Sequence, residues 1–214
     1  MDLLACEMLY EAGTVLSHVY FPITSVVSLV SRLQDGACAE VAMVGREGVA
    51  GVCAFMGGGK ALSSAFVQRP GLAWRMSARD IADLARDCEP MLLELLRYTQ
   101  VLFTHMAQTS ACNRHHALAP QLCRWLLQHL DRQADDDMRI TQERIAVMLG
   151  VRRESVTEAA QQMQRDGLIS YTRGHIRVLD RQRLEQHSCE CYGVVKRAYA
   201  QLCGAQSMPT HSLA

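Results

Sequence analysis

The spacing of apolar residues changes along the chain, and each change predicts a different kind of structure. Up to residue 76 the apolar residues lie in short β-prone runs at 15–21, 25–32, 39–44, 61–68 and 72–76, separated by glycine and proline turns. Many short strands joined by such turns predict a roll or barrel. From Ser77 onwards the spacing becomes helical. A short helix is expected at 78–85, and a long one starts near Glu89 and Pro90.

The long helix carries an apolar seam at spacings of four and three residues. The seam consists of Leu92, Leu96, Thr99, Phe103, Met106, Ser110 and Asn113. A seam of this kind needs a partner helix. We therefore expect the helix to pair in parallel with the same helix of a second chain. The alternative is that it packs only on its own β-domain.

The segment 140–166 has the pattern of a helix-turn-helix. Apolar residues on one face of a first helix include the small Ala146, at a position where a second helix has to cross closely. Gly150 then permits the backbone angle of a sharp turn, and a second helix is expected at about 152–166. Two β-prone runs at 168–179 follow directly. A hairpin in this place predicts a winged helix-turn-helix, whose second helix enters the DNA major groove.

Two arginines, Arg152 and Arg153, stand at the N-terminal end of the second helix, where the helix dipole disfavours cations. Phosphate oxygens or base edges of DNA would remove that conflict. The whole chain has a formal net charge of zero, but residues 138–197 hold eleven Lys and Arg against seven Asp and Glu. Basic charge therefore collects around the helix-turn-helix, as binding to phosphates requires.

Length and composition set the outer bounds. A chain of 214 residues with 49% hydrophobic residues can hold one large or two small domains. We expect a β-domain at 1–88, a linking helix at 89–118 and a DNA-binding domain at 119–214. No apolar run has the length of a membrane span and no signal peptide opens the chain, so we expect a cytoplasmic protein. Nine cysteines without paired spacing indicate free thiols in a reducing compartment.

A β-roll, a long helix and a winged helix-turn-helix, in this order, resemble the Crp/Fnr superfamily of bacterial transcription regulators. The resemblance covers nearly the whole chain and is most specific in ITQERIAVMLGVRRESVTEAAQQMQRDGLI. There the family has a threonine opening the first helix, a glycine at the turn, and an Arg-Glu pair at the head of the recognition helix. The segments QTSACNRHH and CECYGVVK are similar to one broad subgroup of the superfamily.

The resemblance implies an α+β fold: an N-terminal jelly roll like that of cyclic-nucleotide-binding domains, a dimerisation helix and a C-terminal winged helix-turn-helix. It implies a regulator rather than an enzyme. Its partners would be double-stranded DNA, a second copy of the chain and RNA polymerase, with no membrane involved.

The resemblance also assigns roles to residues of the helix-turn-helix. Arg153 and Glu154 match the family's base-reading pair, the arginine on a guanine and the glutamate on a cytosine amine. Thr157 and Glu158 are further candidates for base reading. Candidates for the DNA backbone are Thr141, Gln142, Arg152, Ser155, Arg173 and His175. Two departures are that Glu158 replaces a frequent second reading arginine and that Arg152 replaces a serine that often caps the helix.

The effector site of the family is only weakly matched. In members that bind cyclic nucleotides, a Gly-Glu turn holds the ribose and an Arg-Ser pair holds the phosphate. The corresponding positions here are Gly48, Gly51, Ser63 and Ser64, and the pair has no arginine. A cyclic phosphate would lose a charge-assisted contact of roughly 1.5–3 kcal/mol. We therefore expect that cyclic AMP is not a tight effector, and the effector, if one exists, is unknown.

The sequence offers little for a metal or cofactor. An iron–sulfur switch needs closely placed cysteines, and the N-terminal region has only Cys6, so no cluster is expected. The sharpest metal-like cluster consists of His187, Cys189 and Cys191, but the two cysteines would lie about 200° apart on one helix and could not share an ion unless the helix were broken. No metal site is therefore expected there. His116, next to His115 at the domain junction, is expected to serve interdomain packing or hydrogen bonding.

Two rival classes of function remain for comparison. A β-roll can be a cupin enzyme, but no His-x-His pair occurs, and nor does a nucleophile elbow, a P-loop or a His-Glu-x-x-His helix. The other rival is an interaction or small-molecule-binding protein whose helix-turn-helix lacks sequence-specific DNA binding. Glu158 on the reading face keeps this alternative open.

Overall fold

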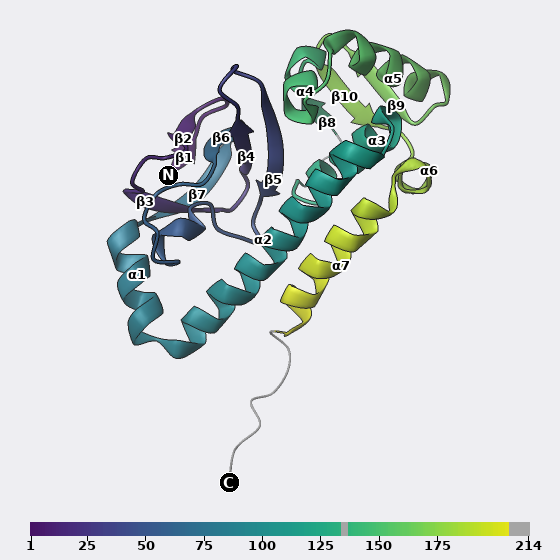
Figure 1. The fold of residues 1–214 in the computed structure, drawn as a ribbon. Helices are drawn as coiled ribbons and strands as arrows, with labels where there is room; N and C mark the ends of the chain where they lie inside the picture. Colours follow the sequence, from purple (N-terminus) through teal and green to yellow (C-terminus); the bar gives the residue numbers. More distant parts are fainter. Residues whose placement is uncertain (134–136, 206–214) are drawn as a thin grey trace.

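In the computed structural model, which describes residues 1–133 and 137–205, the N-terminal part is a β-roll (Figure 1). Its strands form a three-stranded sheet in the order β1-β7-β3 and a four-stranded sheet in the order β2-β6-β4-β5, all antiparallel. The strands are β1 (Asp2–Leu3), β2 (Met8–Tyr10), β3 (His18–Pro22), β4 (Val26–Arg32), β5 (Cys38–Val44), β6 (Ser64–Arg69) and β7 (Gly71–Ser77), and a short 3₁₀ helix is η1 (Val52–Ala54). The five longer strands match the predicted runs, whereas the two short leading strands carry too few residues to show a pattern.

Strand β4 is buried on both faces. Val27 and Leu29 point into the core of the roll. Val26 and Val30, on the other face, belong to the core of the C-terminal domain. Five consecutive residues of β4 are therefore buried, and four of them are apolar, with Ser28 as the exception, so the strand does not alternate between apolar and polar residues. One face of β4 thus belongs to the core of the roll, and its other face belongs to the core of the C-terminal domain.

Two helices connect the roll to the rest of the chain. Helix α1 (Ala78–Asp87) begins as predicted at Ser77, whose side chain accepts a hydrogen bond from the backbone N–H of Asp80. Helix α2 (Glu89–His115) is the predicted long helix, with proline in its first turn. It runs along the roll and ends at the C-terminal domain (Figure 1). No helix in the described ranges is long and apolar enough to cross a membrane.

The C-terminal domain is a winged helix-turn-helix with a leading helix. Its elements are α3 (Leu118–Leu130), β8 (Asp137–Arg139), α4 (Gln142–Leu149), α5 (Arg153–Arg165), β9 (Ile169–Thr172) and β10 (His175–Val178). The strands form one antiparallel sheet in the order β8-β10-β9. Helix α3 begins at Leu118, two residues before Pro120. Pro120 lies in the first turn, where a missing N–H breaks no hydrogen bond.

The end of the chain differs from the expected single helix. Helix α6 (Arg181–His187) stops at Ser188, and α7 (Glu190–Ala205) starts two residues later. Helix α7 lies antiparallel to α2, since Cys189 contacts Cys112 while Tyr199 contacts His105. The prediction that Cys189 and Cys191 lie about 200° apart on one continuous helix is therefore wrong, because the helix is broken at Ser188 and Cys189, so that Cys189 precedes α7 while Cys191 lies in its first turn.

Candidate nucleic-acid interface

The two helices of the helix-turn-helix are held by the residues that the sequence singled out. The hydroxyl of Thr141 caps α4 by accepting a hydrogen bond from the N–H of Arg144. Gly150 ends α4 in the left-handed region, with φ of 66°, which a residue with a side chain adopts only under strain. Ala146 and Val156 are buried where α4 and α5 cross. These residues therefore set the angle between α4 and α5.

The head of α5 carries exposed charges. Arg152 takes the N-cap position without a side-chain capping bond, as expected for an arginine in place of serine. Arg153, Glu154 and Glu158 are exposed on the following turns. Within the part of the chain that the structure describes, no hydrogen bond or ion pair engages the side chains of Arg153 and Glu154. Two side chains that can form bidentate or charge-assisted contacts are thus presented to solvent.

Three other residues of this region lie closer to the protein itself. Thr157 is half-buried, and its hydroxyl donates a 2.7 Å hydrogen bond to Oε1 of Gln142. This bond ties α5 to the start of α4. Ser155 is also half-buried. The bond occupies the hydroxyl hydrogen of Thr157 and the side-chain oxygen of Gln142, whereas the side-chain N–H groups of Gln142 remain able to donate to a phosphate.

The wing lies beside the helix pair. Arg173 and Gly174 form its tip, both with positive φ (47° and 83°), which is the geometry of a tight hairpin turn. His175 is exposed, and its Nδ1 lies 3.5 Å from a carboxylate oxygen of Asp137 on β8. Arg173 and His175 are therefore both accessible at the wing, where the sequence places candidate backbone contacts.

The helix-turn-helix packs on the β-roll through the side away from α5. Figure 1 shows α4 facing β5, with α5 on the opposite side of the domain. Arg144, on α4, stacks over the ring of Phe66 and contacts the sulfur of Cys6. Gly150 lies close to Ala39 of β5. The roll therefore touches the domain without covering the exposed head of α5.

Buried polar contacts join the two domains. Arg132, just after α3, places Nε 2.6 Å from a carboxylate oxygen of Glu47 in the roll, and its guanidinium lies 4.9 Å from the ring centre of Tyr199 on α7. Trp125, on α3, donates a hydrogen bond to Glu40 of β5. Burial raises the pKa of Glu40 to about 7, although bonds from Ser28 and Trp125 oppose the shift. The sequence analysis missed this contact, for which the only signal was an acidic residue within an apolar strand.

The candidate effector positions do not form one site. Gly51 and Ser63 line an apolar cavity of about 30 Å³ inside the roll, under α2. Gly48 lies elsewhere, because a side chain there would meet the ring of Tyr98 at 2.2 Å. Ser64 accepts a hydrogen bond from the N–H of Ala12. A cavity of this size holds about one water molecule, whereas ligand sites measure roughly 300–1,000 Å³.

The predicted dimer seam is only partly exposed. The exposed members of the seam are Leu96, Phe103, Ser110 and Asn113. Leu92 and Met106 pack partly against the roll. Thr99 is buried against its own chain, where its hydroxyl donates to the carbonyl of Leu95, and it therefore cannot belong to an outward seam. The exposed face, with spacings of three and four, consists instead of Leu93, Leu96, Gln100, Phe103, Ala107, Ser110 and Arg114.

The sequence matches two domain families. Residues 2–88 match the cyclic nucleotide-binding domain, and residues 120–187 match the Crp-like helix-turn-helix domain. No curated protein matches the chain.

Solved structures share the fold at low identity. FixK2 from Bradyrhizobium japonicum is 19% identical, with a TM-score of 0.76 over 88% of this chain and 96% of that one. TTHB099, a transcriptional regulator of the CRP family from Thermus thermophilus, is 21% identical, with a TM-score of 0.74 and the same coverage. The c-di-GMP responsive global regulator CLP from Xanthomonas campestris is 13% identical, with a TM-score of 0.66 over 84% of this chain and 93% of that one.

Proposed function

Because the chain belongs to the Crp/Fnr family of transcription regulators, we propose that it reads a specific DNA sequence through the exposed head of α5. The observation that carries the proposal is the exposure of Arg153 and Glu154 with no partner among the described residues. An arginine that no carboxylate neutralises, at the positive end of a helix, is well placed for a guanine edge or a phosphate. Arg152, Arg173 and His175 would then contact the DNA backbone on either side.

We propose further that two chains pair through the exposed face of α2. Leu93, Leu96 and Phe103 are each between 46% and 48% exposed, which is unusual for apolar residues aligned at heptad spacing. Apart from Gln100, the face is apolar from Leu93 to Ala107, and it becomes polar at Ser110 and Arg114, near the C-terminal domain. Such a pair would place two α5 helices about one DNA turn, ~34 Å, apart on a pseudo-palindrome.

The proposal for the roll is that cyclic AMP is not a tight effector. The cavity lined by Gly51 and Ser63 has space for about one water molecule, and none of its lining residues carries a positive charge. Melting temperatures measured with and without millimolar cyclic AMP test this directly. No shift is expected, and a rise of several degrees would contradict the proposal.

Selection from a random duplex library, with the full chain, tests sequence-specific binding. We expect an enriched motif with two half-sites and binding that weakens steeply with salt. Salt-dependent binding without an enriched motif would favour the alternative, an interaction protein that lacks sequence-specific recognition. No binding to duplex DNA at low salt would contradict the DNA-binding proposal as a whole.

A further inference from the structure

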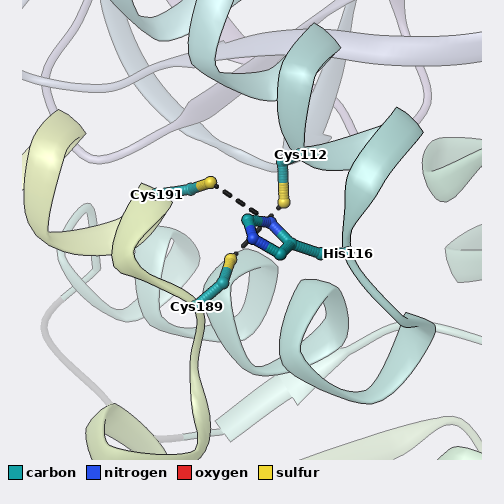
Figure 2. A group of neighbouring side chains, drawn as sticks. All are labelled: Cys112, His116, Cys189 and Cys191. Atoms are coloured by element: carbon teal, nitrogen blue, oxygen red, sulfur yellow. Dashed lines mark hydrogen bonds between the residues drawn. The ribbon is translucent and has the colours of Figure 1, made fainter.

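Four potential metal ligands meet where α2, α6 and α7 come together (Figure 2). Cys112 lies in the last turn of α2 and His116 immediately follows that helix, whereas Cys189 and Cys191 lie at the α6–α7 break. The sulfurs of Cys112 and Cys189 are 3.5 Å apart, and Sγ of Cys191 is 3.4 Å from Nδ1 of His116. All four ligand atoms lie within 4.8 Å of one another.

We propose that Cys112, His116, Cys189 and Cys191 form a tetrahedral zinc site. Zinc bonds of about 2.3 Å to sulfur and 2.0–2.1 Å to nitrogen place tetrahedral ligands about 3.8 Å apart for two sulfurs and about 3.6 Å apart for sulfur and nitrogen. The observed separations are close to both values. They are far longer than the ~2.05 Å of a disulfide, so Cys112 and Cys189 are not bonded to each other.

The surroundings of the four side chains match what a zinc site requires. Nε2 of His116 lies 3.3 Å from a carboxylate oxygen of Glu190. A carboxylate that takes the N–H of Nε2 leaves the lone pair of Nδ1 directed at the ion, which is the usual outer contact of a metal-bound histidine. The side-chain N–H of Gln108 donates a 3.1 Å hydrogen bond to the sulfur of Cys191, as suits a thiolate.

Hydrogen bonds from α3 hold the end of α2. The side-chain amide of Gln121, on α3, donates to the backbone carbonyls of Cys112 and His116. The backbone that carries both ligands on this side of the site is therefore held by the protein itself.

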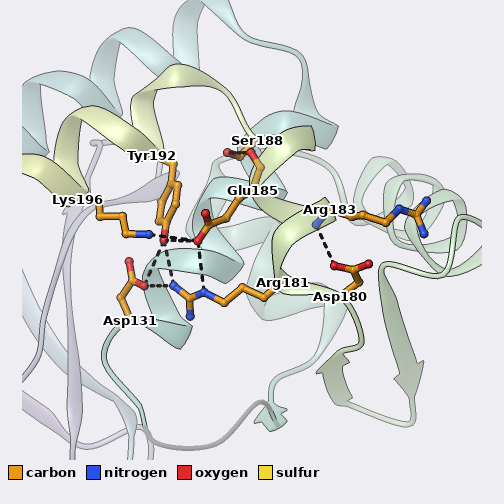
Figure 3. Close-up of polar contacts among 8 residues, drawn as sticks. All are labelled: Asp131, Asp180, Arg181, Arg183, Glu185, Ser188, Tyr192 and Lys196. Atoms are coloured by element: carbon orange, nitrogen blue, oxygen red, sulfur yellow. Dashed lines mark hydrogen bonds and ion pairs between the residues drawn. The ribbon is translucent and has the colours of Figure 1, made fainter.

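Side-chain contacts also hold the break between α6 and α7 (Figure 3). Arg181 contacts Asp131, the residue that follows α3, as well as Glu185 and Tyr192. Ser188 donates to the carbonyl of Glu185 and so ends α6. Cys189 and Cys191 are thus held close to α2 by contacts in which none of the four proposed ligands takes part. A site with its ligands already in place loses little conformational entropy when the ion binds.

The donor set favours one closed zinc ion. Three thiolates and one imidazole are a soft set that suits zinc, and four protein ligands leave no position for water or substrate. Cys112 and Cys191 are at most 1% exposed. A cluster of several irons would hold its thiolates further apart, because they would surround more than one metal atom. Binding of Zn²⁺ would displace the protons of the three thiols to solvent.

A zinc ion here would link the dimer helix to the end of the DNA-binding domain. Two ligands belong to α2 and the residue after it, and two belong to the segment after the wing. The ion would therefore fix the junction at residues 116–118. The proposal concerns metal binding only and does not depend on whether the chain binds DNA.

Metal analysis of the full chain tests the proposal. Protein reduced and supplied with Zn²⁺ without oxygen, then freed of excess metal, is expected to retain one zinc per chain. With Co²⁺ in place of zinc, it should show thiolate-to-cobalt charge transfer and the visible absorption of a tetrahedral site. Glu190→Gln keeps all four ligands and should bind zinc about 10–100-fold more weakly.

The double variant Cys189→Ser/Cys191→Ser should lose the zinc and the cobalt spectrum. The matched control is Cys88→Ser, which replaces an exposed thiol at the N-cap of α2, where serine is favoured. It should retain both. Wild-type protein that holds no more zinc than the double variant would overturn the proposal. So would a cobalt adduct without thiolate charge transfer, or a Glu190→Gln affinity equal to that of the wild type.

Discussion

The indole N–H of Trp125, on α3, donates a 2.9 Å hydrogen bond to a carboxylate oxygen of Glu40, on β5. The other oxygen of Glu40 accepts a hydrogen bond from Ser28. Trp125 and Glu40 are 1% and 5% exposed, so the contact lies inside the boundary between the roll and the C-terminal domain. A buried carboxyl with both oxygens bonded is costly to disturb, because removing one partner leaves a polar atom without water.

The first prediction follows from the pKa of Glu40, which burial raises to about 7 from an ordinary value of 4.5. Between these values the folded state binds more protons than the unfolded state. The contribution of Glu40 to the free energy of unfolding is therefore fully present below pH 4.5. It decreases as the pH rises to 7 and stays low above that pH. The full shift corresponds to about 3 kcal/mol. Glu40→Gln should remove this slope and unfold at a higher urea concentration than the wild type at pH 8.

Urea unfolding at several pH values between 4 and 8 provides the measurement. Glu143→Gln, at an exposed position in the first turn of α4, is the control and should keep the wild-type slope. If Glu40→Gln retains that slope as well, the pH dependence does not come from Glu40.

The second prediction concerns Arg153. Arg153→Ala should weaken binding to the selected DNA site by about 1–3 kcal/mol and relax the preference at one base pair, because a bidentate contact to a base edge is lost. Arg165→Ala removes the same charge from the far end of α5 and serves as the control. Titrations on the selected site and on single-base variants measure both effects. If both variants lose the same binding free energy on every DNA sequence, Arg153 makes only a general electrostatic contact and does not read a base.

The third prediction concerns the exposed face of α2. Phe103→Glu should convert a dimer to monomers at micromolar concentration, because it places two like charges in an apolar seam. Leu33→Glu introduces the same charge at an exposed leucine of the β4–β5 loop and should leave the dimer intact. Sedimentation velocity measures the masses. A wild-type chain that is monomeric at these concentrations would contradict the dimer proposal.

The fourth prediction is that Gly48 is a glycine because of packing and not because it binds a ligand. Gly48→Ala should destabilise the protein by about 1–3 kcal/mol, because its Cβ would overlap the buried ring of Tyr98, which has no room to move. Gly58→Ala is the control, since no atom lies within 4 Å of the added Cβ. Denaturant unfolding of the two variants gives the comparison. A neutral Gly48→Ala would mean that Tyr98 is not fixed against this loop.

The helix-turn-helix could be predicted from the sequence because its determinants are local. Thr141 caps α4 and Gly150 ends it through bonds and angles that involve only neighbouring residues. The same holds for Ser77 at the start of α1. Caps and turns of this kind depend on side-chain chemistry within a few residues, which the sequence displays directly.

Features set by distant parts of the chain could not be predicted. Thr99 fits the heptad as well as its neighbours, and only the packing of the roll decides that it faces inward. The break at Ser188 is stabilised by Arg181, which contacts Asp131, the residue after α3 and 50 residues earlier in the chain. Without that contact, the sequence from Arg181 onwards is compatible with one continuous helix. The meeting of Cys112 with Cys189 depends on this break and lies beyond any local pattern.

The two-sided burial of β4 bears on how this protein can be dissected. Val26 and Val30 complete the interior of the other module, so a fragment cut at the usual junction near residue 118 would expose a fresh apolar surface on each piece. A chimera that joins the C-terminal domain to a different sensor domain would have to include β4 and β5 as well. The same constraint applies to recombination between relatives, because an exchange of either domain has to preserve the packing of β4 on both of its faces.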